Sequence, residues 1–255
     1  MKSVAIIPSR LESSRLPHKA LKDICGIPMI VHVVKRCKLS NELSEVFVAT
    51  DSKEIFDVVT SWGGRVIMTS SEHQTGTDRI AEAAKNIEAD LVVNVQGDEA
   101  LVNPKDIDSI IIVMNNNVDI NVGILVSEFE KENSMGDIKV VLNENSEVMY
   151  LSRSDIPSSS RTKDRRMLKA YHVVPFRKEF LFQYTSWKST ELESIEFNEY
   201  LRILEKGEKI KAVKVESSAI SVDTQEDLAI VRELMKKDPL YLLYKQQKKS
   251  KSFLI

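Results

Sequence analysis

The chain has 255 residues, 42% of them hydrophobic, which suits one large α/β domain or two small ones with a sizeable core. Its 36 basic and 38 acidic residues leave a net charge of −2, so no global field marks it as a binder of nucleic acid or of a membrane. Cys25 and Cys37 are too few for a disulfide framework and lack metal-ligand spacing. No apolar run approaches the ~20 residues of a membrane span, and we expect a soluble cytoplasmic protein.

The first expected element is a strand at residues 3–8 that ends in a basic loop. This apolar run stops at Pro8, and the loop after it carries Arg10, Arg15 and Lys19. Open α/β sheets bind ligands at the carboxyl ends of their strands. The loop is therefore a candidate polyphosphate site, although on this stretch alone a solvated surface loop is the alternative.

The first half of the chain alternates between strand and helix periodicities. Its connections are short and its strands are apolar on both faces, which predicts a mostly parallel sheet with helices on both sides. The expected elements are a helix at 28–37, a strand at 46–50, a helix at 52–62, a strand at 65–68, a helix at 78–87 and a strand at 91–95.

The second half of the chain is less regular and contains an expected β-hairpin, 139–142 with 148–151, around a turn-rich connection. The polar loop at 157–166 is either a solvated linker or a substrate lid carrying Arg161, Arg165 or Arg166. We expect one domain at 1–240 and a basic tail at 241–255. The other expected elements are a helix at 104–114, strands at 120–126, 167–176 and 209–215, and helices at 191–204 and 224–235.

Two aspartates are candidate magnesium ligands. Asp98 follows the fourth expected strand, so it can face the loop that carries Arg10 and Lys19. Magnesium takes one or two carboxylates and completes its shell with phosphate oxygens and water. Asp223 lies just before the closing helix, where an acidic residue beside Thr224 is also an ordinary capping arrangement. Either role is open for Asp223 on the residues alone.

Spaced motifs connect these candidate residues to a known family. They are Ile7-Pro8-Ser9-Arg10 with Ser14-Arg15-Leu16-Pro17-His18-Lys19, His73-Gln74-Thr75-Gly76-Thr77-Asp78-Arg79, Asn94-Val95-Gln96-Gly97-Asp98-Glu99, and Val222-Asp223-Thr224 followed by Glu226-Asp227-Leu228. In this order they resemble the CMP-Kdo synthetases, the 3-deoxy-manno-octulosonate cytidylyltransferases. The resemblance runs from residue 3 to about residue 235, and the set of motifs is far more specific than any one of them.

The resemblance implies an α/β, Rossmann-like nucleotidyltransferase fold of the GT-A-like type, with a mostly parallel sheet and an antiparallel hairpin insertion. It implies a homodimer that uses CTP with Mg²⁺. The reaction would transfer CMP to the anomeric hydroxyl of Kdo, or of a closely related acidic sugar, and release pyrophosphate. The product would supply lipopolysaccharide or surface polysaccharide synthesis. Residues 140–205 would form the acceptor-site and dimerisation region.

The residue chemistry suits such a transfer. Attack on the α-phosphorus needs positioning and charge stabilisation more than covalent help. Arg10 and Lys19 would neutralise the leaving pyrophosphate, and Mg²⁺ held by Asp98 and Asp223 would bridge the α-phosphate and the incoming oxygen. The implied nucleotide contacts are Pro8, Arg10, Arg15, Lys19, Thr75, Gly76, Thr77, Arg79, Gln96 and Asp98. Without the resemblance, Arg79 would more simply be a surface residue on the first turn of its helix.

The acceptor side departs from the family pattern. Where relatives carry His-x-Gly-x-Tyr, this chain has Ala170, His172 and Val174. The implied sugar contacts are Arg153, His172, Glu196, Glu199 and Tyr200, the last where a glutamine is usual. Arg153 could pair with the sugar carboxylate, and His172 is either a new sugar contact or a satisfied strand histidine. The alternatives are a cytidylyltransferase for amino-Kdo, a nonulosonic acid or a hexose phosphate, and a non-catalytic nucleotide-binding relative.

Overall fold

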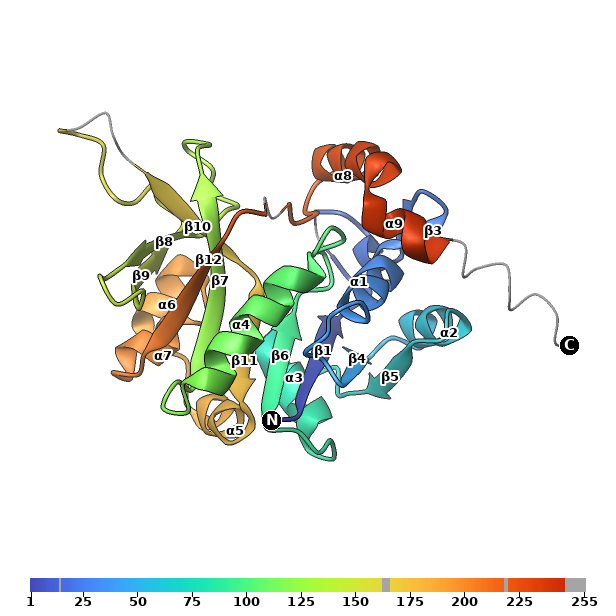
Figure 1. Ribbon diagram of the computed structural model, residues 1–255, viewed down its shortest axis with the longest axis horizontal. Coiled ribbons are helices and arrows are strands. Elements are labelled where there is room, and N and C mark those ends of the chain that lie inside the picture. The colour runs from blue at the N-terminus through green and yellow to red at the C-terminus, as the bar shows by residue number, and fades with distance from the viewer. Residues whose placement is uncertain (14, 162–165, 218–219, 246–255) are drawn as a thin grey trace, which may run out of the picture.

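One mixed sheet forms the centre of the molecule (Figure 1). The computed structural model describes residues 1–13, 15–161, 166–217 and 220–245. Within that part of the chain, the order across the sheet is β5 (Arg65–Met68), β4 (Glu45–Thr50), β1 (Ser3–Ser9), β6 (Leu91–Val95), β11 (Val173–Arg177), β7 (Val122–Phe129), β10 (Met167–Tyr171), β8 (Lys139–Leu142) and β9 (Val148–Ser152), while β12 (Ile210–Val215) pairs with β7. A separate small hairpin joins β2 (Asp23–Ile24) and β3 (Ile27–Pro28).

The two halves of the sheet differ in strand direction. β1 pairs in parallel with both β4 and β6, and β4 pairs in parallel with β5, which confirms the predicted parallel arrangement for the first half of the chain. β11 continues the sheet antiparallel to β6, and β10 runs antiparallel to β7 and β8. The expected hairpin is present as β8 and β9. The second half is therefore largely antiparallel, with β12 alongside β7 as its parallel pair.

Helices cover both faces of the sheet, as predicted. α1 (Met29–Cys37), α2 (Lys53–Ser61) and α4 (Pro104–Asn116) pack in one apolar cluster with Ala5 and Ile7 of β1. α3 (Gly76–Ala84), α5 (Lys178–Ser186) and α7 (Leu201–Glu205) pack in a second cluster with Val4 and Ile6. Successive side chains of a strand point to opposite faces, so β1, buried along its whole length, serves both cores.

Two elements expected as continuous are interrupted. The strand expected at 167–176 is β10 and β11, separated at His172. The helix expected at 191–204 is α6 (Glu191–Glu196) and α7, because Phe197 adopts a left-handed backbone with φ of 48° and ends α6. A left-handed residue cannot continue a right-handed helix, and hydrophobic periodicity does not reveal it.

The C-terminal part packs beside α1. α8 (Gln225–Lys237) is followed by α9 (Pro239–Tyr244), which extends past the domain end expected at residue 240. Tyr244 is buried, and its hydroxyl lies 2.8 Å from Nδ1 of His32. The rest of the expected tail, 246–255, lies outside the described residues. Within the described residues, none of the helices is long and apolar enough to cross a membrane.

Candidate active site

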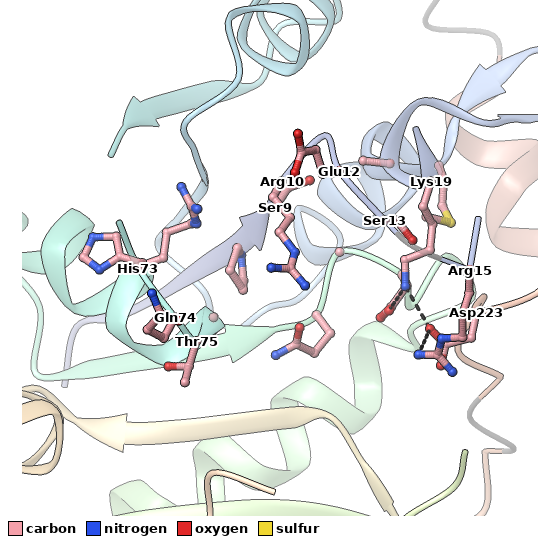
Figure 2. A pocket seen from close by; sticks show the side chains of 18 residues that line it. Ser9, Arg10, Glu12, Ser13, Arg15, Lys19, His73, Gln74, Thr75 and Asp223 are labelled. Atoms are coloured by element: carbon pink, nitrogen blue, oxygen red, sulfur yellow. Dashed lines mark hydrogen bonds and ion pairs between the residues drawn. The ribbon is translucent and has the colours of Figure 1, made fainter. Parts of the chain in front are cut away.

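A polar cavity of about 280 Å³ opens at the carboxyl ends of β1 and β6 (Figure 2). It is the position where an open α/β sheet is expected to bind its ligand. Its lining residues are Pro8, Ser9, Arg10, Glu12, Ser13, Arg15, Lys19, Ala20, Met29, His73, Gln74, Thr75, Gly76, Arg79, Gln96, Gly97, Asp98 and Asp223. Of the predicted nucleotide and metal residues, the structure brings all except Thr77 to this cavity.

A small apolar cluster lies beneath the charged end of the cavity. It contains Leu16 from the basic loop, Ala100 from the turn after β6, and Val222 from the segment before α8. Each of them is one or two residues away from a charged cavity residue in the sequence. Their burial holds three segments together that are far apart in the sequence, and so places Arg15, Asp98 and Asp223 at one end of the cavity.

Lys19 is the centre of the charged cluster. It begins the short 3₁₀ helix η1 (Lys19–Leu21), and its Nζ donates to Asp98 Oδ2 at 2.5 Å and to Asp223 Oδ1 at 3.0 Å. Arg15 Nη2 lies 2.9 Å from the same oxygen of Asp223. Burial by itself lowers the pKa of Lys19, but the two carboxylates outweigh burial, and the pKa is raised above its ordinary value. Lys19 is therefore a fixed positive charge.

The two carboxylates fit a shared magnesium ion. Oxygens of Asp98 and Asp223 already converge on one cation, the Lys19 ammonium. Within the described residues there is no group of three or more acidic, histidine or cysteine side chains that could hold a metal alone. Magnesium requires only one or two protein carboxylates when phosphates and water supply the remaining ligands. The donor set therefore suits a metal that enters with a nucleotide.

Asp223 does not cap the closing helix. Thr224 has that role, because its Oγ1 accepts from the backbone N–H of Asp227, and the Asp227 carboxylate accepts in return from the backbone N–H of Thr224. This is a reciprocal capping box. The capping alternative for Asp223 was wrong, and its carboxylate is directed to Lys19 and Arg15 instead.

Arg10 is a cavity residue without a partner among the residues that the structure describes. It is exposed, lines the cavity, and makes no hydrogen bond or ion pair within the described part of the chain. Figure 2 shows its side chain directed into the cavity from the end of β1. An unpaired guanidinium that faces a polar cavity can bind a phosphate in the bidentate manner that arginine favours.

The other end of the cavity is built by the N-terminus of α3. Thr75 caps this helix through its Oγ1, which accepts from the backbone N–H of Asp78 at 3.1 Å. Gly76 allows a close approach, because a Cβ there would lie only 3.2 Å from Cγ of Pro8. Gln96 also lines this part of the cavity. The free N–H groups of such a helix end favour a negatively charged or polar ligand.

Without the family resemblance, Arg79 would be expected on the surface, and this expectation is wrong. Arg79 is buried, and its guanidinium donates to Thr69 Oγ1 at 2.7 Å and to Asp51 Oδ2 at 3.1 Å. These bonds join α3 to the segments after β4 and β5, so Arg79 stabilises the cavity wall. Thr77 is also buried, and its hydroxyl donates to Glu199 rather than lining the cavity.

Arg153, the predicted partner of a sugar carboxylate, is engaged with the backbone. Its Nε donates to Glu196 O at 2.9 Å, its Nη1 to Met135 O at 3.0 Å, and its Nη2 to Phe197 O at 3.1 Å. Sugar binding by Arg153 stays a prediction that requires exchange of these bonds. In this structure the residue joins the loop before β8 to the end of α6.

The other predicted sugar residues lie apart from the cavity lining. Glu196 accepts from Ser152 Oγ and from the backbone N–H of Arg153. Tyr200 is buried, with its hydroxyl 3.2 Å from Asn94 Nδ2. Burial raises the pKa of Glu199 to about 7. His172 is half-buried between β10 and β11, and its side chain forms no hydrogen bond with any described residue. The His172 side chain is thus available for a ligand, as far as the described residues are concerned.

Sequence reasoning missed a buried acid behind Asp98. Glu99 is 1% exposed and accepts a hydrogen bond from Ser221 Oγ, and burial together with the Asp98 charge raises its pKa to about 7. Nothing in the sequence distinguished Glu99 from Asp98 as the cavity residue, because adjacent residues in a turn point in directions that only tertiary packing sets. Glu12, His73 and Gln74 also line the cavity without having been predicted.

This cavity is suited to bind a phosphate-bearing ligand together with a divalent cation. The family model described as Cytidylyltransferase matches residues 4–210. The chain belongs to the cytidylyltransferase family.

Comparison with individual proteins shows which cytidylyltransferases the chain is similar to. The chain is 41% identical over 242 residues to the 3-deoxy-manno-octulosonate cytidylyltransferase of Geobacter metallireducens, covering 89% of this chain and 95% of that one. It is 39% identical to the enzyme of the same name from Fusobacterium nucleatum, covering 93% and 98%. A solved CMP:2-keto-3-deoxy-manno-octonic acid synthetase in complex with CTP has a TM-score of 0.89 and 35% identity, covering 93% and 99%. A Leptospira borgpetersenii cytidylyltransferase, with a TM-score of 0.65 and 18% identity, shares the fold.

Proposed function

We propose that this enzyme transfers CMP from CTP to the anomeric hydroxyl of Kdo, or of a closely related 3-deoxy-ulosonic acid, and releases pyrophosphate. The observation that carries the proposal is the convergence of Asp98 and Asp223 on Lys19 in a cavity that also contains Arg10, which has no partner among the described residues. The names of the relatives and the CTP complex of the structural neighbour support both substrates. The activated sugar would serve lipopolysaccharide or surface polysaccharide synthesis.

The cations of the basic loop would bind the triphosphate. An ammonium group has three N–H donors, and Lys19 uses two of them on Asp98 and Asp223. The third remains for a phosphate oxygen. Arg10 can offer its whole guanidinium. Together they would stabilise the negative charge that develops on the departing pyrophosphate, which is the main demand of this reaction.

Asp98 and Asp223 would hold Mg²⁺ between them and the nucleotide. When bound, such an ion neutralises phosphate charge and favours deprotonation of an oxygen that binds it. Within the protein, Lys19 keeps the two carboxylates close together and offsets their mutual repulsion. This arrangement accounts for a transfer reaction without a histidine or cysteine as the base.

The specificity for the acceptor sugar would be set by residues 140–205, where Ala170, His172 and Val174 depart from the pattern of the family that the chain resembles. A site built to bond particular hydroxyls rejects analogues strongly, so replaced contacts can change the substrate. By the family resemblance, His172 takes the place of a glycine, and its side chain forms no hydrogen bond with any described residue. An amino-substituted Kdo or a nonulosonic acid therefore remains the second candidate acceptor.

We also propose a homodimer in the cytoplasm. The exposed side chains of Phe197 and Met135 lie on the two segments that Arg153 joins, and Ile195 and Met149 are exposed as well. Such large apolar side chains are typical of a surface that a second copy covers. The two cysteines are free, as a reducing compartment requires. Sedimentation equilibrium should give twice the mass of one chain, and a monomer at micromolar concentration would contradict the dimer.

Pyrophosphate release tests the proposed activity. The purified protein would be incubated with CTP, Mg²⁺ and, in separate reactions, Kdo, an amino-substituted Kdo, a nonulosonic acid and a hexose phosphate, with the product identified by mass spectrometry. We expect CMP-Kdo to form fastest. Release with a different acidic sugar alone would select the second candidate. No release with any acceptor would contradict the proposed activity.

A further inference from the structure

Two hydrogen bonds join the segment that carries Asp223 to the turn that carries Asp98. The backbone N–H of Val222 donates to Asp98 O at 3.1 Å. Next to it, Ser221 Oγ donates to Glu99 Oε1 at 2.5 Å. Both bonds connect residues more than 120 positions apart in the sequence, so they help to set the distance between the two carboxylates.

The two sides of this connection differ in how firmly they are held. The turn after β6 is closed by its own backbone bonds, since Glu99 N donates to Gln96 O at 3.2 Å and Val102 N donates to Glu99 O at 2.9 Å. Asp223 instead lies in a segment between β12 and α8 that has no regular secondary structure in its described residues. The position of Asp223 therefore depends on what its neighbours contact.

Glu99 is well suited to anchor that segment. Its side chain is 1% exposed, and Ser221 is the residue whose side chain donates to it. A hydrogen bond to a buried carboxyl is stronger than one between exposed neutral groups. The apolar cluster beneath the cavity and the Thr224–Asp227 capping box hold α8 independently. Loss of the Ser221 hydroxyl would then loosen Asp223 without unfolding the helix.

We propose that Ser221 and Glu99 are positioning residues that hold Asp223 beside Asp98 and so set the affinity of the nucleotide complex for its divalent cation. This inference rests on the proposed function, because it assumes that the two aspartates share a metal. Ser221 does not face the reacting groups. It acts through Asp223, and its effect should appear in metal affinity rather than in maximal turnover.

The chain offers a matched control for this contact. Ser217 lies in the same connection between β12 and α8, but its hydroxyl accepts from Asn103 Nδ2 at 3.1 Å and does not reach the turn of Asp98. Ser221→Ala and Ser217→Ala each remove one bonded hydroxyl from this connection. Only the first removes a bond to Glu99. A purely structural role would affect both variants alike.

The test measures Mn²⁺ binding by electron paramagnetic resonance in the presence of α,β-methylene-CTP, a non-reacting analogue, for the wild type and both variants. We expect Ser221→Ala to weaken Mn²⁺ binding about tenfold, the size of a lost hydrogen bond to a buried carboxyl, and Ser217→Ala to leave it within twofold. In turnover assays, Ser221→Ala should need about tenfold more Mg²⁺ and recover its kcat at saturation. Ser221→Thr, which keeps the hydroxyl, should restore part of the affinity.

Two outcomes would overturn the inference in distinguishable ways. Equal Mn²⁺ affinity in Ser221→Ala and the wild type, with CMP-sugar formed by both, would remove the positioning role and leave the proposed function intact. Absence of nucleotide-dependent Mn²⁺ binding in the wild type itself would contradict the shared metal site and the positioning role together.

Discussion

The nucleotide end and the acceptor end of the sheet use their arginines in opposite ways. Arg10 is exposed, faces the cavity, and has no partner among the described residues. Arg153 donates from all of its guanidinium nitrogens to backbone carbonyls. A ligand that binds Arg153 must first break these hydrogen bonds to the backbone, whereas a ligand that binds Arg10 breaks no bond to a described residue. We therefore expect Arg10 to be the better placed of the two arginines to bind a ligand.

The charged cluster allows the sharpest test of this contrast. Asp223→Asn removes a charge that faces Lys19 and the proposed metal, so turnover should fall about 100-fold or more with the fold intact. Thr224→Ala removes the neighbouring cap and should lower the free energy of unfolding by about 1 kcal/mol while turnover changes less than twofold. Steady-state kinetics and urea unfolding of both variants measure the two effects. Near-normal turnover in Asp223→Asn would reduce Asp223 to a structural residue.

On the proposed acceptor side, we expect substitution of Arg153 to lower the stability of the protein more than its affinity for the sugar. Arg153→Ala breaks the connection between the loop before β8 and the end of α6, so the free energy of unfolding should fall by roughly 2 kcal/mol. The KM for the acceptor sugar, measured at a temperature where the variant is folded, should rise less than threefold. A KM raised tenfold or more with unchanged stability would show that Arg153 leaves its carbonyl partners and binds the sugar.

The contact between α3 and the segment before α7 gives an effect on stability that depends on pH. Glu199 accepts from Thr77 Oγ1 at 2.8 Å, and burial raises the pKa of Glu199 to about 7. The folded state therefore binds this proton more tightly than the unfolded state, and stability should fall as pH rises from about 4.5 to 7. Over this range the wild type should lose about 2–3 kcal/mol more than Glu199→Gln, which keeps an acceptor for Thr77 but cannot ionise. Parallel pH profiles of the two proteins would show that Glu199 is ionised throughout.

Sequence reasoning reached the nucleotide end because its residues lie in loops directly after strands. A parallel sheet brings such loops to one edge whatever the details of packing, so Arg10, Lys19 and Asp98 could be placed together. Asp223 comes from the far end of the chain; the residues alone left it open between a metal ligand and a helix cap, and the resemblance favoured the metal ligand. The apolar cluster beneath these residues, which completes the placement, was not foreseen.

The remaining differences arise where orientation depends on tertiary contacts. Thr77 and Arg79 are in the first turn of α3, and which of them faces the cavity or the sheet depends on how the helix docks. The backbone turn at Phe197 and the break at His172 leave no mark in hydrophobic periodicity, so single elements were expected in place of pairs. Hydrogen-bonding partners of Arg153 are backbone carbonyls, which no side-chain pattern can indicate.

The central claim is that Arg10, which has no partner among the described residues, binds the nucleotide, and that Arg153, which is bonded to backbone carbonyls, does not. Calorimetric titration of CTP with Mg²⁺ into the wild type, Arg10→Ala and Arg153→Ala, at a temperature where all three are folded, tests it directly. Loss of a charge-assisted phosphate contact should weaken CTP binding about 10- to 100-fold in Arg10→Ala, while Arg153→Ala should stay within twofold of the wild type. Equal CTP affinity in Arg10→Ala and the wild type would contradict the account.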